Sequence, residues 1–294
     1  MAEPLRQLVL SARARLVAAG IDAALAAMDA ALLARHVLGW DRARFLAHDT
    51  DPAPEAFPAA FDGLVARRTR REPLSSITGW REFWGLDFEV TRDVLTPRPE
   101  TEAVVEEAIA CLAGGAGSRP GSADPGRFVD VGTGSGCLAI CLAREVAASR
   151  VVATDISAAA LAVARRNAAR LGVADRVEFR RSSILDGISP PVALVVSNPP
   201  YVPTDAIPAL MPEVRQWEPG EALDGGADGL DAVRALVAAA PGVLQPGGWL
   251  IMEFGYGQDQ AVQAIVAESP LHLVRIRNDV QGIPRTLVAR TPAD

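Results

Sequence analysis

The stretch Asp130-Val131-Gly132-Thr133-Gly134-Ser135-Gly136 is the strongest indication of the fold. It directly follows the apolar run 128–131, which is typical of a buried strand, and precedes the apolar helix pattern 138–146. Alternate glycines permit a tight turn close to a ligand, and free N–H groups at the helix start can bind a carboxylate. Because the spacing differs from the G-x-G-x-x-G of nicotinamide sites, we expect a nucleoside without a pyrophosphate.

Asp155 ends the next apolar run, 151–154. A carboxylate at such a strand tip can accept hydrogen bonds from both ribose hydroxyls. The alternative is that Asp155 or Ser157 caps the following helix pattern, 158–171. Since the glycine turn lies one strand earlier, we favour ribose binding. Together, the turn and the acid indicate a nucleoside cofactor.

Apolar runs continue to alternate with helix patterns toward the C-terminus. The further strands that we expect are 177–179, 192–196 and 249–254, with 271–277 and 286–289 as an antiparallel pair that could close the sheet. The alternation predicts a doubly wound, Rossmann-like α/β domain over residues 97–294, with its ligand crevice at the carboxyl ends of the strands. The Gly-, Pro- and Ser-rich segment 114–127 is expected to be a surface loop.

Residues 1–75 have helical patterns, and we expect a small helical bundle that recognises the substrate. The segment 76–96 contains several β-forming residues, and Gly79 and Gly85 offer turns. This composition predicts a β-hairpin or an extended linker. Four arginines, Arg67, Arg68, Arg70 and Arg71, form a basic run at the end of a helix pattern. We interpret this run as a solvated helix face in preference to a contact with RNA or an acidic partner.

Composition excludes several classes of protein. All 29 basic residues are Arg, so no Schiff-base, Walker or general-base lysine is available. The three cysteines are too few and wrongly spaced for a structural zinc site, and we expect no metal. No apolar stretch approaches the roughly 20 residues of a membrane span, and the N-terminus does not read as a signal peptide, so we expect a cytoplasmic protein. Residues 73–294 contain 19 Arg and 27 acidic residues, which argues against direct nucleic-acid binding.

The motif Asn198-Pro199-Pro200-Tyr201 follows the apolar run 192–196. Consecutive prolines stiffen the backbone, so the Asn198 side-chain oxygen and the Pro199 carbonyl become two preset acceptors beside the flat ring of Tyr201. Accepting both N–H bonds of a planar NH2 group raises electron density on its nitrogen and aligns the lone pair with a sulfonium methyl group. No general base is required, because the methylated nitrogen is strongly acidic. The alternative is a purely structural Pro-Pro loop.

These motifs together are similar to a known family. The chain resembles the bacterial protein-(glutamine-N5) methyltransferases that modify class-I peptide chain release factors. The likeness covers nearly the whole chain and rests on 79–90, 95–102, 130–136, Asp155, 197–201 and 218–230. It implies a class I methyltransferase domain, S-adenosyl-L-methionine as the cofactor, and the glutamine of a Gly-Gly-Gln loop as the acceptor. We further expect a monomer whose partner is a class-I release factor.

The resemblance also implies roles for individual residues. The backbone of Gly132, Thr133, Gly134, Ser135 and Gly136, which follows Asp130, would hold the cofactor, with Asp155 on its ribose. Asn198 would contact both cofactor and glutamine, while Pro199, Pro200 and Tyr201 would frame the amide. Pro97, Arg98 and Thr101 would close the methionine end. The chain departs from the family at 181–184, where an acidic or aromatic residue often contacts adenine, so we expect Ser183, the backbone or neighbouring apolar groups to make these contacts. It also departs at Ala193, where Asp is frequent.

Three other functions stay open at the level of sequence. A sister glutamine methyltransferase acting on a ribosomal protein would perform the same reaction. A methyltransferase for exocyclic amines of nucleic acid shares the Asn198–Tyr201 motif, although the acidic second part of the chain argues against it. The third is a non-catalytic binding protein that senses the cofactor or docks on a translation factor through its helical domain. The intact motif disfavours it, because a pure binder does not need Asn198.

Overall fold

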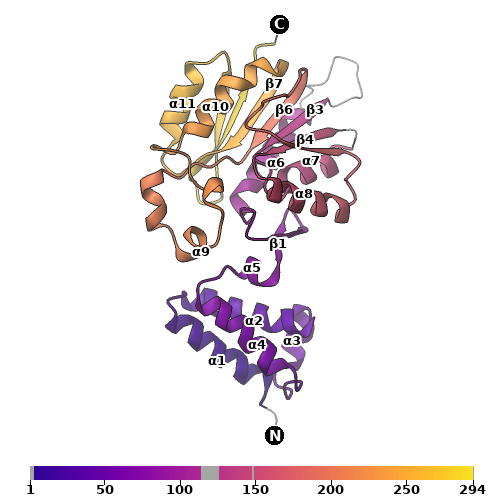
Figure 1. Ribbon diagram of the computed structural model, residues 1–294, viewed down its shortest axis with the longest axis vertical. Coiled ribbons are helices and arrows are strands. Elements are labelled where there is room, and N and C mark those ends of the chain that lie inside the picture. Colours follow the sequence, from indigo (N-terminus) through magenta and orange to yellow (C-terminus); the bar gives the residue numbers. More distant parts are fainter. Residues whose placement is uncertain (1–2, 114–125, 148, 294) are drawn as a thin grey trace. The chain divides into compact units, whose positions relative to one another are not determined.

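The computed structural model describes residues 3–113, 126–147 and 149–293, so most of the expected surface loop 114–127 lies outside the described residues. The chain divides into two compact units (Figure 1). The first comprises Met1–Trp80 with Met211–Trp217, and the second comprises Arg81–Leu210 with Glu218–Asp294. Among the helices of the described ranges, none combines the length and apolar character of a membrane span.

The first unit is helical, as the sequence predicts. Its helices are α1 (Leu5–Ala18), α2 (Ala23–Leu38), α3 (Arg42–His48), α4 (Phe57–Thr69), α5 (Leu74–Thr78) and the short α9 (Pro212–Arg215). The carboxylate of Asp22 caps α2 by accepting from the N–H groups of Ala24 and Leu25, and Gly39 ends α2 with φ of 64°. Buried side chains of α1, α2 and α4 form one hydrophobic core.

The interpretation of the basic run as a solvated face is wrong for Arg67, Arg68 and Arg71, which are buried or half-buried and paired with acids, whereas Arg70 is exposed. Arg68 is only 6% exposed and donates to Asp29 of α2 at 2.7 Å and to Glu213 of α9 at 2.9 Å. Arg71 also donates to both carboxylate oxygens of Glu213, and Arg67 pairs with Glu72. Burial raises the pKa of Glu213, but hydrogen bonds from the arginines lower it on balance. Arg68 and Arg71 therefore hold α9 on the helical unit.

The second unit contains two sheets. Strands β1 (Trp80–Phe83), which begins at the unit boundary, and β2 (Leu86–Glu89) form the expected hairpin sheet. The seven-stranded sheet is made of β3 (Arg127–Val131), β4 (Arg150–Asp155), β5 (Val177–Arg181), β6 (Val192–Ser197), β7 (Leu244–Glu253), β8 (His272–Asn278) and β9 (Pro284–Arg290). Every expected strand is present, although β7 begins five residues earlier than the expected Trp249.

The large sheet has the strand order β5-β4-β3-β6-β7-β9-β8. The first five strands in this order are parallel, and β9 pairs antiparallel with both β7 and β8, which confirms the expected antiparallel closure. The order reverses at β3, where the chain moves first to β4 and later to β6. Such a switch point opens a crevice at the carboxyl ends of the strands.

Helices cover both faces of this sheet (Figure 1). They are α6 (Glu102–Ala113), α7 (Cys137–Glu145), α8 (Ala158–Arg170), α10 (Asp231–Ala239) and α11 (Asp259–Ala267), with short 3-10 turns η1 (Pro99–Thr101), η2 (Thr204–Ala209), η3 (Gly220–Ala222) and η4 (Ala240–Gly242). Alternate residues along each strand enter opposite cores, so Phe128 packs with α6 and α7 while Val129 packs with α10 and α11. All six residues of β6 are buried.

Candidate active site

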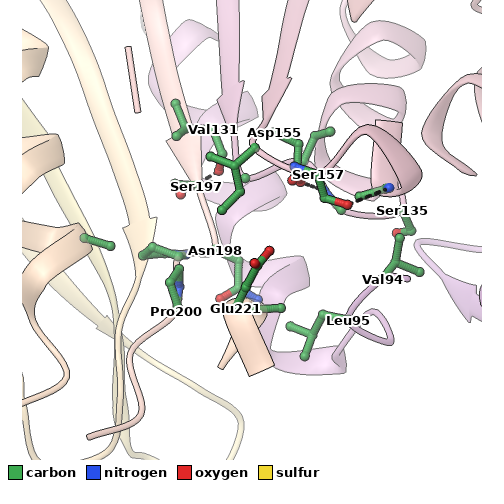
Figure 2. Close-up of a pocket in the computed structure, with 18 of the residues that line it drawn as sticks. Val94, Leu95, Val131, Ser135, Asp155, Ser157, Ser197, Asn198, Pro200 and Glu221 are labelled. Atoms are coloured by element: carbon green, nitrogen blue, oxygen red, sulfur yellow. Dashed lines mark hydrogen bonds between the residues drawn. The ribbon is translucent and has the colours of Figure 1, made fainter. Parts of the chain in front are cut away.

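A cavity of about 260 Å³ lies at the carboxyl ends of β3, β4 and β6, where the switch point predicts a crevice (Figure 2). Eleven of the residues predicted from the sequence line it: Pro97, Thr101, Gly132, Thr133, Gly134, Ser135, Asp155, Ser183, Asn198, Pro199 and Pro200. Four other predicted residues, Asp130, Gly136, Arg98 and Tyr201, are not among its described lining residues. The structure therefore brings most of the predicted set around one cavity.

The glycine turn brings backbone N–H groups to the cavity wall. Gly132 and Gly134 adopt left-handed φ angles of 69° and 54°, which favour glycine. The N–H of Thr133 donates to the Thr154 carbonyl, and the N–H of Gly134 donates to Asp155 Oδ2, both at 2.9 Å. Gly136 serves packing instead, since an added Cβ would lie 3.0 Å from Ile140 and 3.1 Å from Ala164.

Asp155 is free to serve the cavity because another residue caps the helix that follows. The hydroxyl of Ser157 is the N-cap of α8 and accepts from the N–H of Ala160. The carboxylate of Asp155 accepts from the N–H groups of Gly134 and Ser157, both at 2.9 Å. Burial raises the pKa of the Asp155 carboxyl. The alternative in which Asp155 itself caps α8 is wrong.

Asp130 lies beneath the turn and is fully buried. Its Oδ2 accepts from the hydroxyl of Thr133 at 2.6 Å and from the N–H of Ala139 at 3.1 Å. Burial raises its pKa to about 7. These contacts hold the turn against the start of α7, so Asp130 acts on the cavity through the backbone.

The far end of the cavity beyond Asp155 is formed by Ile156 and by Ser182, Ser183 and Ile184 after β5. Ile156 is 50% exposed although it is a large apolar residue. An apolar side chain that stays exposed on a cavity wall suits a flat aromatic ligand group. Ile156 was not predicted as a site residue, although it directly follows Asp155.

Asn198 follows β6 directly, and its side chain faces the cavity (Figure 2). Its Nδ2 donates to the hydroxyl of Thr101 at 2.9 Å. Its Oδ1 is buried and has no hydrogen-bond partner among the described residues. A buried acceptor without a donor is costly, which marks Oδ1 as an atom that a ligand is expected to satisfy.

The other residues of the Asn198–Tyr201 motif differ in whether they line the cavity. Pro199 and Pro200 line the cavity, whereas the Tyr201 hydroxyl donates to the buried carboxylate of Glu253 at 2.9 Å. Burial raises the pKa of Tyr201 far above its usual range. Arg98 donates to Glu218 at 2.5 Å.

Some lining residues were missed by sequence reasoning. Asp93 and Glu221 bring carboxylates to the cavity, and Glu221 faces it from η3 (Figure 2). Neither residue belongs to a periodic helix or strand pattern in the sequence, so only the surrounding motif could have indicated it. In the described part of the chain, no group of three or more His, Cys, Asp or Glu could hold a metal ion.

Comparisons with known proteins match most of the chain. A family model described as the PrmC N-terminal domain matches residues 7–79, and one described as the methyltransferase small domain matches residues 121–211. The release factor glutamine methyltransferase of Cereibacter sphaeroides is 46% identical over 280 residues, which cover 95% of each chain. The protein of the same name from Rhodospirillum rubrum is 42% identical over 266 residues, which cover 90% of this chain and 79% of that one.

Two solved structures show the same fold at low identity. The hMettl16 catalytic domain, solved with a MAT2A 3′UTR hairpin, has a TM-score of 0.56 and 15% identity, and the match covers 79% of this chain and 82% of that one. A methyltransferase from Pyrococcus furiosus has a TM-score of 0.52 and 18% identity, covering 77% of this chain and 98% of that one. The fold is therefore that of a class I methyltransferase.

Proposed function

This chain belongs to the release factor glutamine methyltransferase family, and from that premise we propose that it methylates a glutamine side chain. The methyl donor is S-adenosyl-L-methionine. The acceptor is the amide nitrogen, N5, of the glutamine in the Gly-Gly-Gln motif of a class-I peptide chain release factor. The observation that carries the proposal is the buried Oδ1 of Asn198, which has no donor among the described residues.

The cavity fits the cofactor. Asp155 offers a carboxylate to the ribose hydroxyls, and the apolar wall at Ile156 and Ile184, with Ser183, suits the adenine ring. The turn 132–136 would lie against the methionine end of the cofactor, with Pro97 and Thr101 beside it. The bound cofactor supplies an electrophilic methyl group on a sulfonium.

The chain's own residues prepare the glutamine nitrogen. Asn198 Oδ1 and the carbonyl of Pro199 accept the two N–H bonds of the amide, which raises electron density on nitrogen and orients its lone pair. The prolines that follow Asn198 keep both acceptors in place, so little reorganisation is required during the reaction. The nitrogen becomes strongly acidic once it is methylated, so its proton can leave to water.

We extend the proposal to the setting of the enzyme. The substrate partner is a class-I release factor, recognised with the help of the helical unit. Residues 73–294 hold 19 Arg against 27 acidic residues, and this excess of negative charge disfavours a nucleic-acid substrate. We place the enzyme in the cytoplasm, because its substrate acts in translation. We also propose that it acts as a monomer.

The test is a methylation assay with labelled S-adenosyl-L-methionine and a purified class-I release factor, read by mass spectrometry of the Gly-Gly-Gln peptide. We expect one methyl group on the glutamine and none on a factor carrying Ala at that position. Asn198→Ala should still bind the cofactor and lose about 100- to 1000-fold in kcat. Label on a ribosomal protein or on RNA in place of the factor would refute the substrate assignment.

A further inference from the structure

The carboxylate of Glu253 lies behind the cavity at the end of β7 and is only 1% exposed. Its Oε2 accepts from the hydroxyl of Thr101 at 2.6 Å, and its Oε1 accepts from the hydroxyl of Tyr201 at 2.9 Å. Both donors flank Asn198, one in η1 and one within the Asn198–Tyr201 motif. Glu253 thus connects two separate parts of the site.

The direction of these hydrogen bonds determines how Asn198 is oriented. A hydroxyl has one proton to donate, and Thr101 gives it to Glu253. Thr101 can then only accept from Asn198, so it receives the Nδ2–H at 2.9 Å. The amide nitrogen of Asn198 therefore faces Thr101, and its oxygen remains for the substrate.

The opposite orientation of the amide is disfavoured by the same network. An Asn oxygen and nitrogen have nearly the same shape, so hydrogen-bond partners decide which one faces the cavity. With the amide reversed, Thr101 would have to donate to Asn198, and a buried oxygen of Glu253 would lose its donor. The NH2 of Asn198 would then face the NH2 of the glutamine, with two donors opposed.

We propose that Glu253, acting through Thr101, is the positioning residue that presents the oxygen of Asn198 to the substrate amide. This inference rests on the proposed function, because it assumes an NH2 group as the acceptor of the methyl group. Glu253 does not touch the reacting atoms. Its hydrogen bond from Tyr201 also anchors the end of the rigid turn, so one carboxylate fixes both the orientation of Asn198 and the position of the turn behind it.

The same arrangement explains why the acceptor is an amide. In the proposed function, Asn198 Oδ1 and the Pro199 carbonyl are the two acceptors, and they require two donors. A glutamine NH2 supplies both, whereas a glutamate carboxylate supplies none and would leave the buried acceptors unpaired. Glu253 thereby contributes to substrate specificity without contacting the substrate.

Steady-state methylation of the release factor by Glu253→Gln tests the inference. Thr101 and Tyr201 donate to different oxygens of Glu253, and Gln replaces one of these oxygens with an NH2 group. When that NH2 group faces Thr101, the Thr101 hydroxyl accepts from it and becomes free to donate to Asn198. We expect kcat to fall about 10- to 100-fold because the acceptor is misoriented. The KM for the factor and the Kd for S-adenosylhomocysteine should stay within about threefold of the wild type, since the loss is confined to the transition state.

Thr101 provides a matched pair of variants. Thr101→Val keeps the shape of the side chain but removes the hydroxyl that relays the orientation, and it should lose kcat in the same range as Glu253→Gln. Thr101→Ser restores the hydroxyl and should recover most of that loss. If Thr101→Ser is as slow as Thr101→Val, the hydroxyl is not the relay and the inference is wrong.

Glu107 is the matched control for removing a buried carboxylate. It is 7% exposed in α6, pairs with Arg275 and Arg277, and is not among the described residues around the cavity. Glu107→Gln should leave kcat unchanged, and an equal loss in both Gln variants would overturn the inference. In an Asn198→Ala background, Glu253→Gln should cost less than about threefold, because its effect acts through Asn198.

The outcomes separate the two proposals. A wild-type protein that binds the cofactor but leaves the factor unmethylated refutes the proposed function, and the inference falls with it. An active wild type together with a Glu253→Gln variant of equal kcat refutes the inference alone. Both proposals are supported by an active wild type, a slow Glu253→Gln variant, a Thr101→Ser variant that recovers the kcat lost in Thr101→Val, and an unaffected Glu107→Gln variant.

Discussion

Replacing Gly136 by Ala should destabilise the catalytic unit through two separate costs. Gly136 starts α7 with φ of 87°, a left-handed conformation that costs an L-residue about 1–2 kcal/mol. An added Cβ would also lie 3.0 Å from Ile140 Cδ1, 3.1 Å from Ala164 Cβ and 3.3 Å from Ala164 Cα. Such overpacking in a close-packed core costs about 1–3 kcal/mol. The expected loss in unfolding free energy is therefore about 2–5 kcal/mol.

The matched control is Gly172→Ala. Gly172 has a similar φ of 74°, but in the described part of the chain nothing lies within 4 Å of the Cβ that Ala would add. Urea unfolding followed by tryptophan fluorescence gives the free energy for each variant. Gly172→Ala should lose only about 1–2 kcal/mol, which is the conformational cost. Equal losses for the two variants would refute the close approach of Gly136 to α8.

Two more predictions concern buried charges. Arg68→Ala should cost about 3–5 kcal/mol of unfolding free energy, because it removes this partner from the buried carboxylate of Asp29 and from the half-buried carboxylate of Glu213. Arg70 is exposed, and Arg70→Ala should change the unfolding free energy by less than about 0.5 kcal/mol. Similar losses in both variants would contradict the buried pairing. Burial raises the pKa of Asp130 from 3.8 to about 7, so the folded protein retains a proton that the unfolded chain releases. The contribution of Asp130 to the unfolding free energy is therefore complete below about pH 4, and it falls by about 4 kcal/mol as the pH rises to about 7. Asp130→Asn should flatten that part of the pH profile of urea unfolding, and an unchanged slope would contradict the assignment.

The strands could be predicted because each one carries its own local signal. The run 192–196 is entirely apolar, and β6 is the strand whose six residues are all buried between two layers of helices. β7 was predicted too short because residues 245–248 are Gln, Pro, Gly and Gly, which lack strand propensity. Its pairing with β6 extends it to Leu244, across a register irregularity between Val192 and Leu194. Strand order in the sheet depends on such pairings and has no local signal.

The parts of the structure that were predicted correctly are those in which residues adjacent in sequence act together. The parts that were missed depend on residues far apart in the chain. The glycine turn and the Asn198–Tyr201 motif are continuous segments, so their composition reveals them. The basic run was misinterpreted because the acid that binds Arg68 and Arg71, Glu213, is more than 140 residues away in the chain. Nothing in a helix pattern distinguishes an arginine that meets a distant carboxylate from one that meets water.

The role of Glu253 at the reacting centre also depends on residues far apart in the chain, although its position could be predicted from the sequence. A charged residue at the carboxyl end of an apolar strand, Trp249–Met252, is itself a signal, because the ends of parallel strands meet at the crevice. The signal identifies an acid near the site but not its task, since the sequence does not show that Thr101 stands between Glu253 and Asn198. The prolines determine where the backbone of the turn lies, and the carboxylate determines which atom of the amide faces the substrate. A stiff turn with a reversed amide would present a donor to a donor, so the reaction requires both.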